Sequence, residues 1–366
     1  MQRGVRRVAV TISVTIAGMT VATGLTGCGL LHDTPRIDAA AKFLPSDTTA
    51  IVFTDRQAVA QRLGVDVSGR DATDEQVVSY NKALADQGWG TTQLATYLTV
   101  MKDAPFNELD IRWEAAARWG SGADARSAYV WRVSDKLDLG GLDRSLTEDG
   151  WKKDTVDGLA RYTIDFAKAA DPNTGLVAGM YPAAMTDVLI DSDDHLVVGS
   201  GDPAALADIA AVANGDATSL AKQRGAFAPL LDKAEKAEFA AMSTGSGICQ
   251  QVTAYGTDKP TKPGPLYDAL GHPTARALVA TGDPMATTSY LEFGSADEAA
   301  ADATARQALI AQGKELRSEQ PFRHLGTFTV THDGSLEAIA SSWATGPRAA
   351  VSTEITGGGP AACLPS

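Results

Sequence analysis

The sequence predicts an α+β protein in which antiparallel sheets, built from hairpins, pack against helices. Three observations lead to this fold class. Apolar and polar residues alternate along short runs such as Ile111–Trp119, which is the period of a half-buried strand. Short turn sequences such as Asp333-Gly334 join pairs of these runs. Helical runs with capping residues, such as the one that Asp202-Pro203 opens, stand between the hairpins.

The predicted N-terminal half, residues 43–256, begins with a strand and a short helix. Residues 50–54 form a β-rich run that predicts the strand. Asp55 follows directly and has the position of an N-cap. Gly64 has the position at which a glycine ends a helix, so the helix is expected between these two residues.

An α-helical insert is predicted near residues 66–105. Its first helix is expected to begin at a capping box that Thr73 and Gln76 form. Its second helix is expected to begin at Thr91 and to end before Pro105, because proline cannot continue a helix.

Two hairpins follow the insert, with a helix and a further strand between them. In the first hairpin strand, Glu114 and its polar neighbours alternate with apolar residues and are expected on the exposed side. The predicted elements are hairpin strands Ile111–Trp119 and 128–133, a helix at 142–148, a strand at 159–164, hairpin strands 188–190 and 196–198, and a helix from Asp202 to Asn214-Gly215.

Residues 257–265 contain three prolines and predict a surface connection to a C-terminal half, residues 266–356. The predicted elements there are hairpin strands Ala275–Thr281 and 287–293, a capped helix from Ser295 to Gly313, and hairpin strands 327–331 and 336–341. Hairpin, helix and hairpin thus occur twice. Two interpretations are open: a duplicated unit, or one irregular α+β domain whose successive hairpins pair as sequential strands usually do.

The glycine-rich segment at the C-terminus, Gly357-Gly358-Gly359-Pro360, lacks the strand-to-helix context of a nucleotide-binding loop. Residues 357–366 are therefore predicted to form a flexible tail that makes little apolar contact with the body.

The N-terminus has the features of a secretory signal. Three arginines precede the apolar run 8–21, which is too short and too rich in Thr and Ser to favour a membrane span. Leu25-Thr26-Gly27-Cys28 follows and resembles the lipobox of bacterial lipoproteins. The alternatives are an ordinary secretory signal with a chance cysteine, and a transmembrane anchor that is never cleaved.

The resemblance to lipoproteins implies that residues 1–27 are removed and that the Cys28 thiol carries a diacylglyceryl group. Two acyl chains, at about 0.8 kcal/mol per buried methylene, make a durable anchor. The mature protein is then expected at the cell membrane, on its extracytoplasmic face. Residues 28–42 are predicted to be a tether between the lipid and the folded body.

The charge of the chain argues against a nucleic-acid partner. Residues 1–27 hold three of the 32 basic residues and none of the 45 acidic residues, so the mature chain has a formal charge of −16. Such a chain repels phosphate backbones and anionic lipid headgroups. The membrane is therefore expected to be reached through the Cys28 lipid.

Two further runs resemble a bacterial envelope family of unknown function. Leu44-Pro45-Ser46-Asp47-Thr48 precedes a predicted strand, and Val197-Val198-Gly199-Ser200 precedes a predicted helix. The resemblance brings no assigned activity, cofactor or site residue.

Ser219 and Lys222 have the Ser-x-x-Lys spacing that makes a serine nucleophilic in penicillin-binding proteins. The companion motifs Ser-Asp-Asn and Lys-Thr-Gly are missing from the sequence. Gly199-Ser200-Gly201 and Gly245-Ser246-Gly247 lack the spacing of an esterase elbow. We therefore interpret Ser219 and Lys222 as part of a capped surface helix that starts near Thr218, and we predict no catalytic residue.

Asp191, Asp193, Asp194 and His195 form the densest group of possible metal ligands. The group lacks the glycine and the distal glutamate of a calcium loop, and it lies where a hairpin turn needs polar residues. The other histidines have no zinc spacing. We predict a solvated turn, no metal site and no cofactor.

Cys249 and Cys363 are the two cysteines that remain once Cys28 is acylated. Thiols outside the cytoplasmic membrane can be oxidised, and two cysteines allow one intramolecular pairing. A disulfide between them is expected, and the alternative is two thiols that stay buried or free.

The sequence thus suggests a lipid-anchored protein that is not an enzyme. Its expected role is binding or envelope organisation, with an unidentified envelope protein as the partner. One alternative is a carrier that encloses an apolar ligand or lipid. Another is an enzyme of a type that no motif in the sequence identifies.

Overall fold

The structure is a computed structural model that describes residues 36–64, 72–87, 94, 106–165, 183–245, 248–249, 263–282 and 286–364. Residues from Pro35 onward form one compact unit. The predicted signal peptide and Cys28 lie outside the described residues, as does most of the predicted tether.

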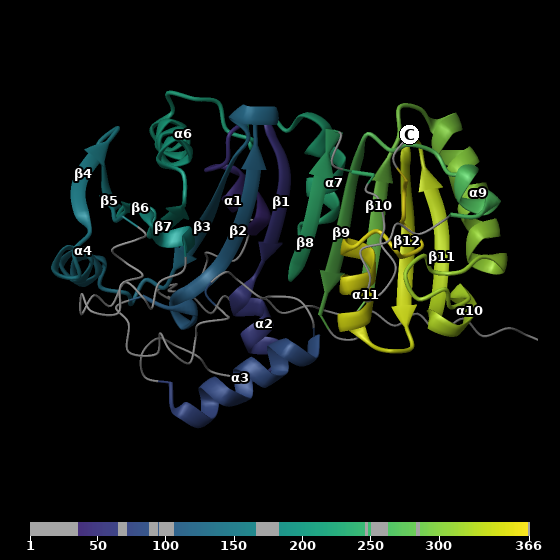
Figure 1. Cartoon of the computed structure of the whole chain (residues 1–366), viewed down its shortest axis with the longest axis horizontal. Coiled ribbons are helices and arrows are strands. Elements are labelled where there is room, and N and C mark those ends of the chain that lie inside the picture. The colour runs from purple at the N-terminus through teal and green to yellow at the C-terminus, as the bar shows by residue number, and fades with distance from the viewer. Residues whose placement is uncertain are drawn as a thin grey trace, which may run out of the picture. The chain divides into compact units, whose positions relative to one another are not determined.

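The strands of the described residues form one antiparallel sheet of twelve strands, which confirms the predicted α+β fold class (Figure 1). The order across the sheet is β11-β12-β10-β9-β8-β1-β2-β3-β7-β6-β5-β4. The strands are β1 Thr48–Thr54, β2 Ile111–Trp119, β3 Arg126–Val133, β4 Lys152–Val156, β5 Leu159–Thr163, β6 Asp187–Asp191, β7 Leu196–Ser200, β8 Phe239–Thr244, β9 Ala275–Thr281, β10 Ala286–Glu292, β11 Gly326–Asp333 and β12 Leu336–Trp343.

Helices cover both faces of this sheet. On β1, Ile51 and Phe53 join the largest apolar cluster together with helices α1, α6 and α7. Helices α2, α3 and α11 pack with Phe239 and Leu278, which the strand register places on the opposite face. The helices are α1 Arg36–Ala41, α2 Arg56–Arg62, α3 Asp74–Gln87, α4 Leu139–Glu148, α6 Pro203–Asn214, α7 Ala228–Lys233, α8 Pro265–Asp268, α9 Ala296–Gln312, α10 Phe322–Leu325 and α11 Pro347–Ile355.

The two halves of the sheet have the same topology. β1 and β8 pair antiparallel at the centre. Outward from β1 the order is β2, β3, β7, β6, and outward from β8 it is β9, β10, β12, β11. The hairpin β4–β5 is the one pair of strands without a counterpart among the described residues. This matching order favours the duplicated unit. In this order the second set of strands begins at β8, ahead of the predicted connection at 257–265, of which residues 257–262 lie outside the described residues.

Local capping signals explain several helix ends. The Asp55 carboxylate accepts from the amide of Ala58, and the Asp202 carboxylate accepts from the amide of Ala204. Thr73 and Gln76 form the expected reciprocal capping contacts at the start of α3. The second predicted helix of the insert, from Thr91 to Pro105, lies outside the described residues apart from the buried Leu94.

Some expectations differ from the structure at the level of single elements. Part of the predicted tether folds, because Ile37, Ala40 and Ala41 form the buried side of helix α1. The turn between β11 and β12 consists of Gly334 and Ser335, one position later than predicted, since Asp333 already pairs with Leu336.

Glu114 is buried, with 5% of its surface exposed, and does not lie on an exposed strand face as the alternating pattern suggested. It faces Trp131 on the neighbouring strand β3, and the Trp131 indole donates a hydrogen bond to its carboxylate. The alternation of apolar and polar residues along β2 could not reveal that both faces of the sheet are covered at Glu114. Among the described residues no helix is long and apolar enough to cross a membrane.

Candidate functional site

Ser219 and Lys222 do not lie on a helix, so the predicted capped helix near Thr218 is wrong. Ser219 forms an isolated β-bridge with Pro45, and its hydroxyl accepts from the backbone amide of Lys222 at 3.3 Å. Backbone hydrogen bonds to the segment before β1 hold this turn, as between the Leu220 amide and the Leu44 carbonyl at 2.7 Å. The serine hydroxyl and the lysine amine are therefore not stacked one helical turn apart.

The carboxylate of Asp191 closes the β6–β7 turn. Its Oδ1 atom accepts from the amides of Asp193 at 3.0 Å and Asp194 at 3.2 Å. The acidic group thus has a structural role in its own turn. No group of three or more His, Cys, Asp or Glu residues in the described part of the chain is placed to hold a metal ion.

A cavity of about 450 Å³ lies between helix α6, the β2–β3 turn and the segment that precedes β1. Its volume falls in the range of small-molecule sites. The lining residues are Pro45, Ser46, Asp47, Trp119, Gly120, Asp124, Arg126, Asp208, Ala211, Val212, Ala217 and Thr218.

A three-residue hydrogen-bonded group fixes the polar side of the cavity. Trp119 ends β2, Arg126 begins β3, and the two residues are directly paired in the sheet. Both donate to the Oδ2 atom of Asp208 on helix α6, at 2.7 Å from the Trp119 indole and 2.5 Å from the Arg126 guanidinium. The hydrogen bond and the charge of Asp208 raise the pKa of Arg126. The lining is therefore held by one helix and two strands.

Sequence reasoning missed this cavity, because its polar residues are 82 and 89 positions apart in the chain. Three lining residues, Pro45, Ser46 and Asp47, belong to the run that resembles the envelope family. The resemblance predicts no function for these three residues.

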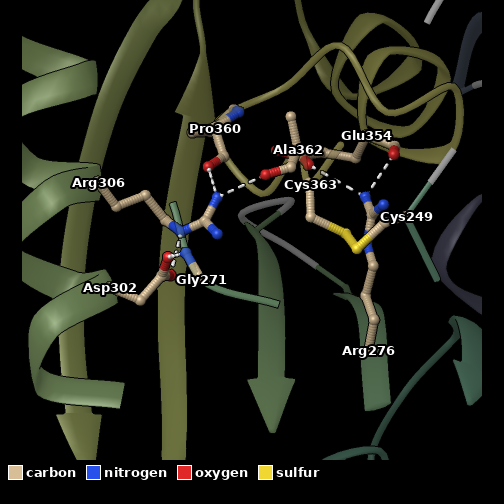
Figure 2. Close-up of a disulfide and its surroundings, with 9 residues drawn as sticks. All are labelled: Cys249, Gly271, Arg276, Asp302, Arg306, Glu354, Pro360, Ala362 and Cys363. Atoms are coloured by element: carbon tan, nitrogen blue, oxygen red, sulfur yellow. Dashed lines mark hydrogen bonds and ion pairs between the residues drawn. A yellow bond between two sulfur atoms is a disulfide. The ribbon is translucent and has the colours of Figure 1, made fainter. Parts of the chain in front are cut away.

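The structure joins Cys249 to Cys363 in the predicted disulfide, with their Cα atoms 4.8 Å apart. Close to this bond, the buried guanidinium of Arg306 donates to the carbonyls of Pro360 at 2.6 Å and Ala362 at 3.0 Å (Figure 2). Its Nε atom also donates to Asp302 at 2.8 Å. These contacts hold the end of the chain against helix α9.

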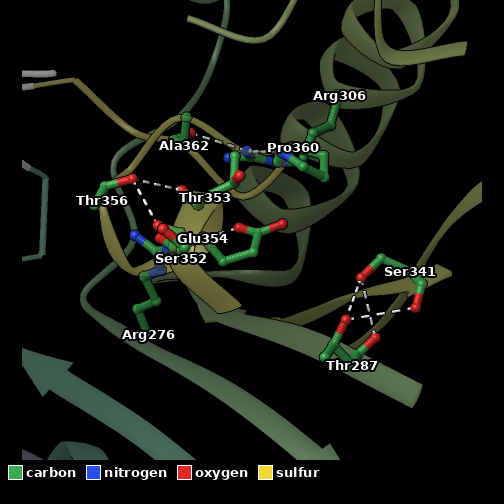
Figure 3. A network of polar contacts seen from close by, with 10 residues as sticks. All are labelled: Arg276, Thr287, Arg306, Ser341, Ser352, Thr353, Glu354, Thr356, Pro360 and Ala362. Carbon is green, nitrogen blue, oxygen red and sulfur yellow. Dashed lines mark hydrogen bonds and ion pairs between the residues drawn. The ribbon is translucent and has the colours of Figure 1, made fainter. Parts of the chain in front are cut away.

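A second buried arginine holds the preceding helix. The guanidinium of Arg276 donates to the backbone carbonyl of Glu354 at 2.5 Å, near the end of α11 (Figure 3). Burial lowers the pKa of Arg276 and raises the pKa of Glu354, while each charge opposes the shift of the other. The Thr356 hydroxyl donates to the Ser352 carbonyl at 2.7 Å, which satisfies one of the last helix carbonyls.

The predicted flexible tail is thus packed over its first residues, and Pro360, Ala361, Ala362 and Cys363 are buried. The glycines serve close approach. A Cβ atom on Gly358 would lie 2.1 Å from a carboxylate oxygen of Glu315, so a side chain there would displace this buried carboxylate.

Another buried polar group lies at the junction of α2 and β2. Arg56 donates to Glu108 at 2.6 Å, and both side chains are almost fully buried. Burial raises the pKa of the nearby Glu114 carboxyl to about 8, although Arg56 and the Trp131 hydrogen bond act in the opposite direction. The raised pKa favours the neutral form of this carboxyl, which is part of the core.

Comparison with known proteins finds no matching family model and no match among curated proteins. Solved structures of TP0453 are similar over most of their length. Its crystal form III has 12% sequence identity and a TM-score of 0.42, covering 86% of this chain and 97% of that chain. Crystal form IV has 13% identity and the same TM-score, covering 85% and 96%. Similarity at this level does not bear on function.

Proposed function

We propose that the protein is a lipid-anchored lipoprotein on the extracytoplasmic face of the cell membrane, with a non-enzymatic role in binding or envelope organisation. The lipobox ending at Cys28 supports the anchor. The disulfide between Cys249 and Cys363 fits an oxidising compartment outside the cytoplasm.

The cavity beside Asp208 is the observation that carries the binding role. It has the volume of a small-molecule site, and hydrogen bonds between secondary-structure elements fix the side chains of Trp119, Arg126 and Asp208 in place. Binding is favoured over acyl transfer because the Ser219 hydroxyl is used within its own turn. The charged lining is also a poor environment for the apolar ligand of a carrier, since charged groups lose hydration against hydrocarbon.

Native mass spectrometry of the full protein, extracted in mild detergent from its own host, tests this role. The proposal expects a polar small molecule or an envelope protein to travel with the folded body. An acyl lipid that stays with the body in addition to the covalent anchor would instead establish the carrier. Covalent labelling by a fluorophosphonate probe, or acylation by and hydrolysis of a β-lactam, would contradict the non-enzymatic role.

A further inference from the structure

We propose that the cavity beside Asp208 binds a small organic ammonium cation, which is a protonated primary amine on a flexible chain. The inference rests on the binding role proposed above and names the chemistry of the ligand. The cavity, the charge of its lining and the nearby helix end support it together.

The first step concerns charge. Asp47, Asp124 and Asp208 line the cavity together with one cation, Arg126, so the lining has a formal charge of −2. Arg126 is already paired with Asp208 at 2.5 Å. Among the described residues, neither Asp47 nor Asp124 forms an ion pair, and both are exposed. The remaining field in the cavity therefore favours a positive ligand.

The C-terminal end of helix α6 adds to the negative charge of the lining. Ala211 and Val212, in the last turn of α6, line the cavity, and Gly215 ends this helix in the left-handed conformation. The C-terminal end of a helix carries a partial negative charge, which adds to that of the carboxylates.

The third step separates an organic cation from a metal ion. The described residues offer no group of three or more ligands arranged for a metal. A volume of about 450 Å³ is also far larger than a metal ion requires. An ammonium group with several methylenes attached suits both the volume and the mixed lining of carboxylates, alanines and valine.

Isothermal titration calorimetry of the full mature protein in detergent tests this inference. The two ligands are spermidine, which is a free polyamine, and Nα-acetyl-lysine methylamide, which carries its free amine on a peptide-like side chain. Whichever of them binds identifies the source of the amine. The same lysine ligand acetylated at its side-chain amine lacks the positive charge and should give no heat of binding. Added salt should weaken the binding of the charged ligand, because the carboxylates lie near solvent.

The variants distinguish this cavity from the general negative charge of the protein. Asp47→Asn and Asp124→Asn leave the fold untouched, because both residues are exposed, and each should weaken binding by about tenfold, as expected when a charged hydrogen bond is lost. Asp154→Asn is the matched control. Asp154 pairs with Arg161 at 2.5 Å on edge strand β4, away from the cavity lining, so its loss should leave binding unchanged.

Absence of binding by both amines would overturn the inference, and so would equal weakening by Asp154→Asn. A different polar molecule found by native mass spectrometry would then leave the proposed binding role in place. Absence of any ligand or partner, together with no amine binding, would overturn both proposals.

Discussion

Removal of the disulfide should destabilise the protein mainly by freeing the unfolded chain. Cys249 and Cys363 are 114 residues apart, and a closed loop of this length is worth about 5 kcal/mol in the chain-entropy model. In the double variant Cys249→Ser with Cys363→Ser, the carbonyls of Pro360 and Ala362 keep their hydrogen bonds to Arg306. The native segment therefore stays in place, and the loss appears in the unfolded state.

Urea unfolding, followed by tryptophan fluorescence, measures this effect. We expect the free energy of unfolding of the double variant to fall by about 3 to 5 kcal/mol. The dependence on urea should become steeper, because an unfolded chain without the cross-link exposes more surface. Wild-type protein unfolded with a reductant is the matched control and should behave like the variant.

Two results would refute this reasoning. One is an unchanged free energy of unfolding with an unchanged urea dependence. The other is titration of two thiols, Cys249 and Cys363, in the denatured and unreduced wild-type protein.

Three further predictions concern the buried charges and the serine. The Glu114 pKa of about 8 lies above its unfolded value near 4.5, so this carboxyl contributes stability at low pH that is lost as pH rises through 8. Between pH 6 and pH 9 the unfolding free energy should fall by about 3 kcal/mol, and Glu114→Gln should remove this part of the fall in urea titrations at the two pH values. Arg306→Met should cost about 3 to 5 kcal/mol in the same assay, because it leaves buried carboxylates without a counter-charge, and an unchanged midpoint would contradict the structural role of Arg306. Ser219→Ala and Lys222→Ala should each leave cellular function intact, whereas labelling of Ser219 by a fluorophosphonate or penicillin-type probe would show that it is a nucleophile.

The sequence predicted those parts of the fold that depend on neighbouring residues. Hairpin strands such as β9 and β10, and capped helices such as α6 and α9, follow from local periodicity and from residues such as Asp202 and Ser295. Strand β4 was missed because its side chains are exposed, so its residues show no apolar alternation. Strand β8 was missed although it begins the second half of the sheet.

The candidate site was beyond sequence reasoning for a physical reason. The contact of Asp208 with Trp119 and Arg126 exists because helix α6 packs over β3, β6 and β7, and no local pattern encodes that packing. The glycines at 357–359 were misread for a similar reason. Glycine suits both a flexible segment and a tightly packed one. Here the buried carboxylates of Glu315 and Glu354 approach the glycines closely, and the sequence does not show that these carboxylates are buried.

The most direct test of the proposed anchored binding protein is the intact mass of the protein extracted from the membranes of its own host. We expect a mature chain that begins at Cys28 and carries the added mass of a diacylglyceryl group. The Cys28→Ser variant, prepared in parallel, should be released from the membrane or remain as uncleaved precursor. A mature N-terminus at another residue, or a wild-type chain without added acyl mass, would contradict the account.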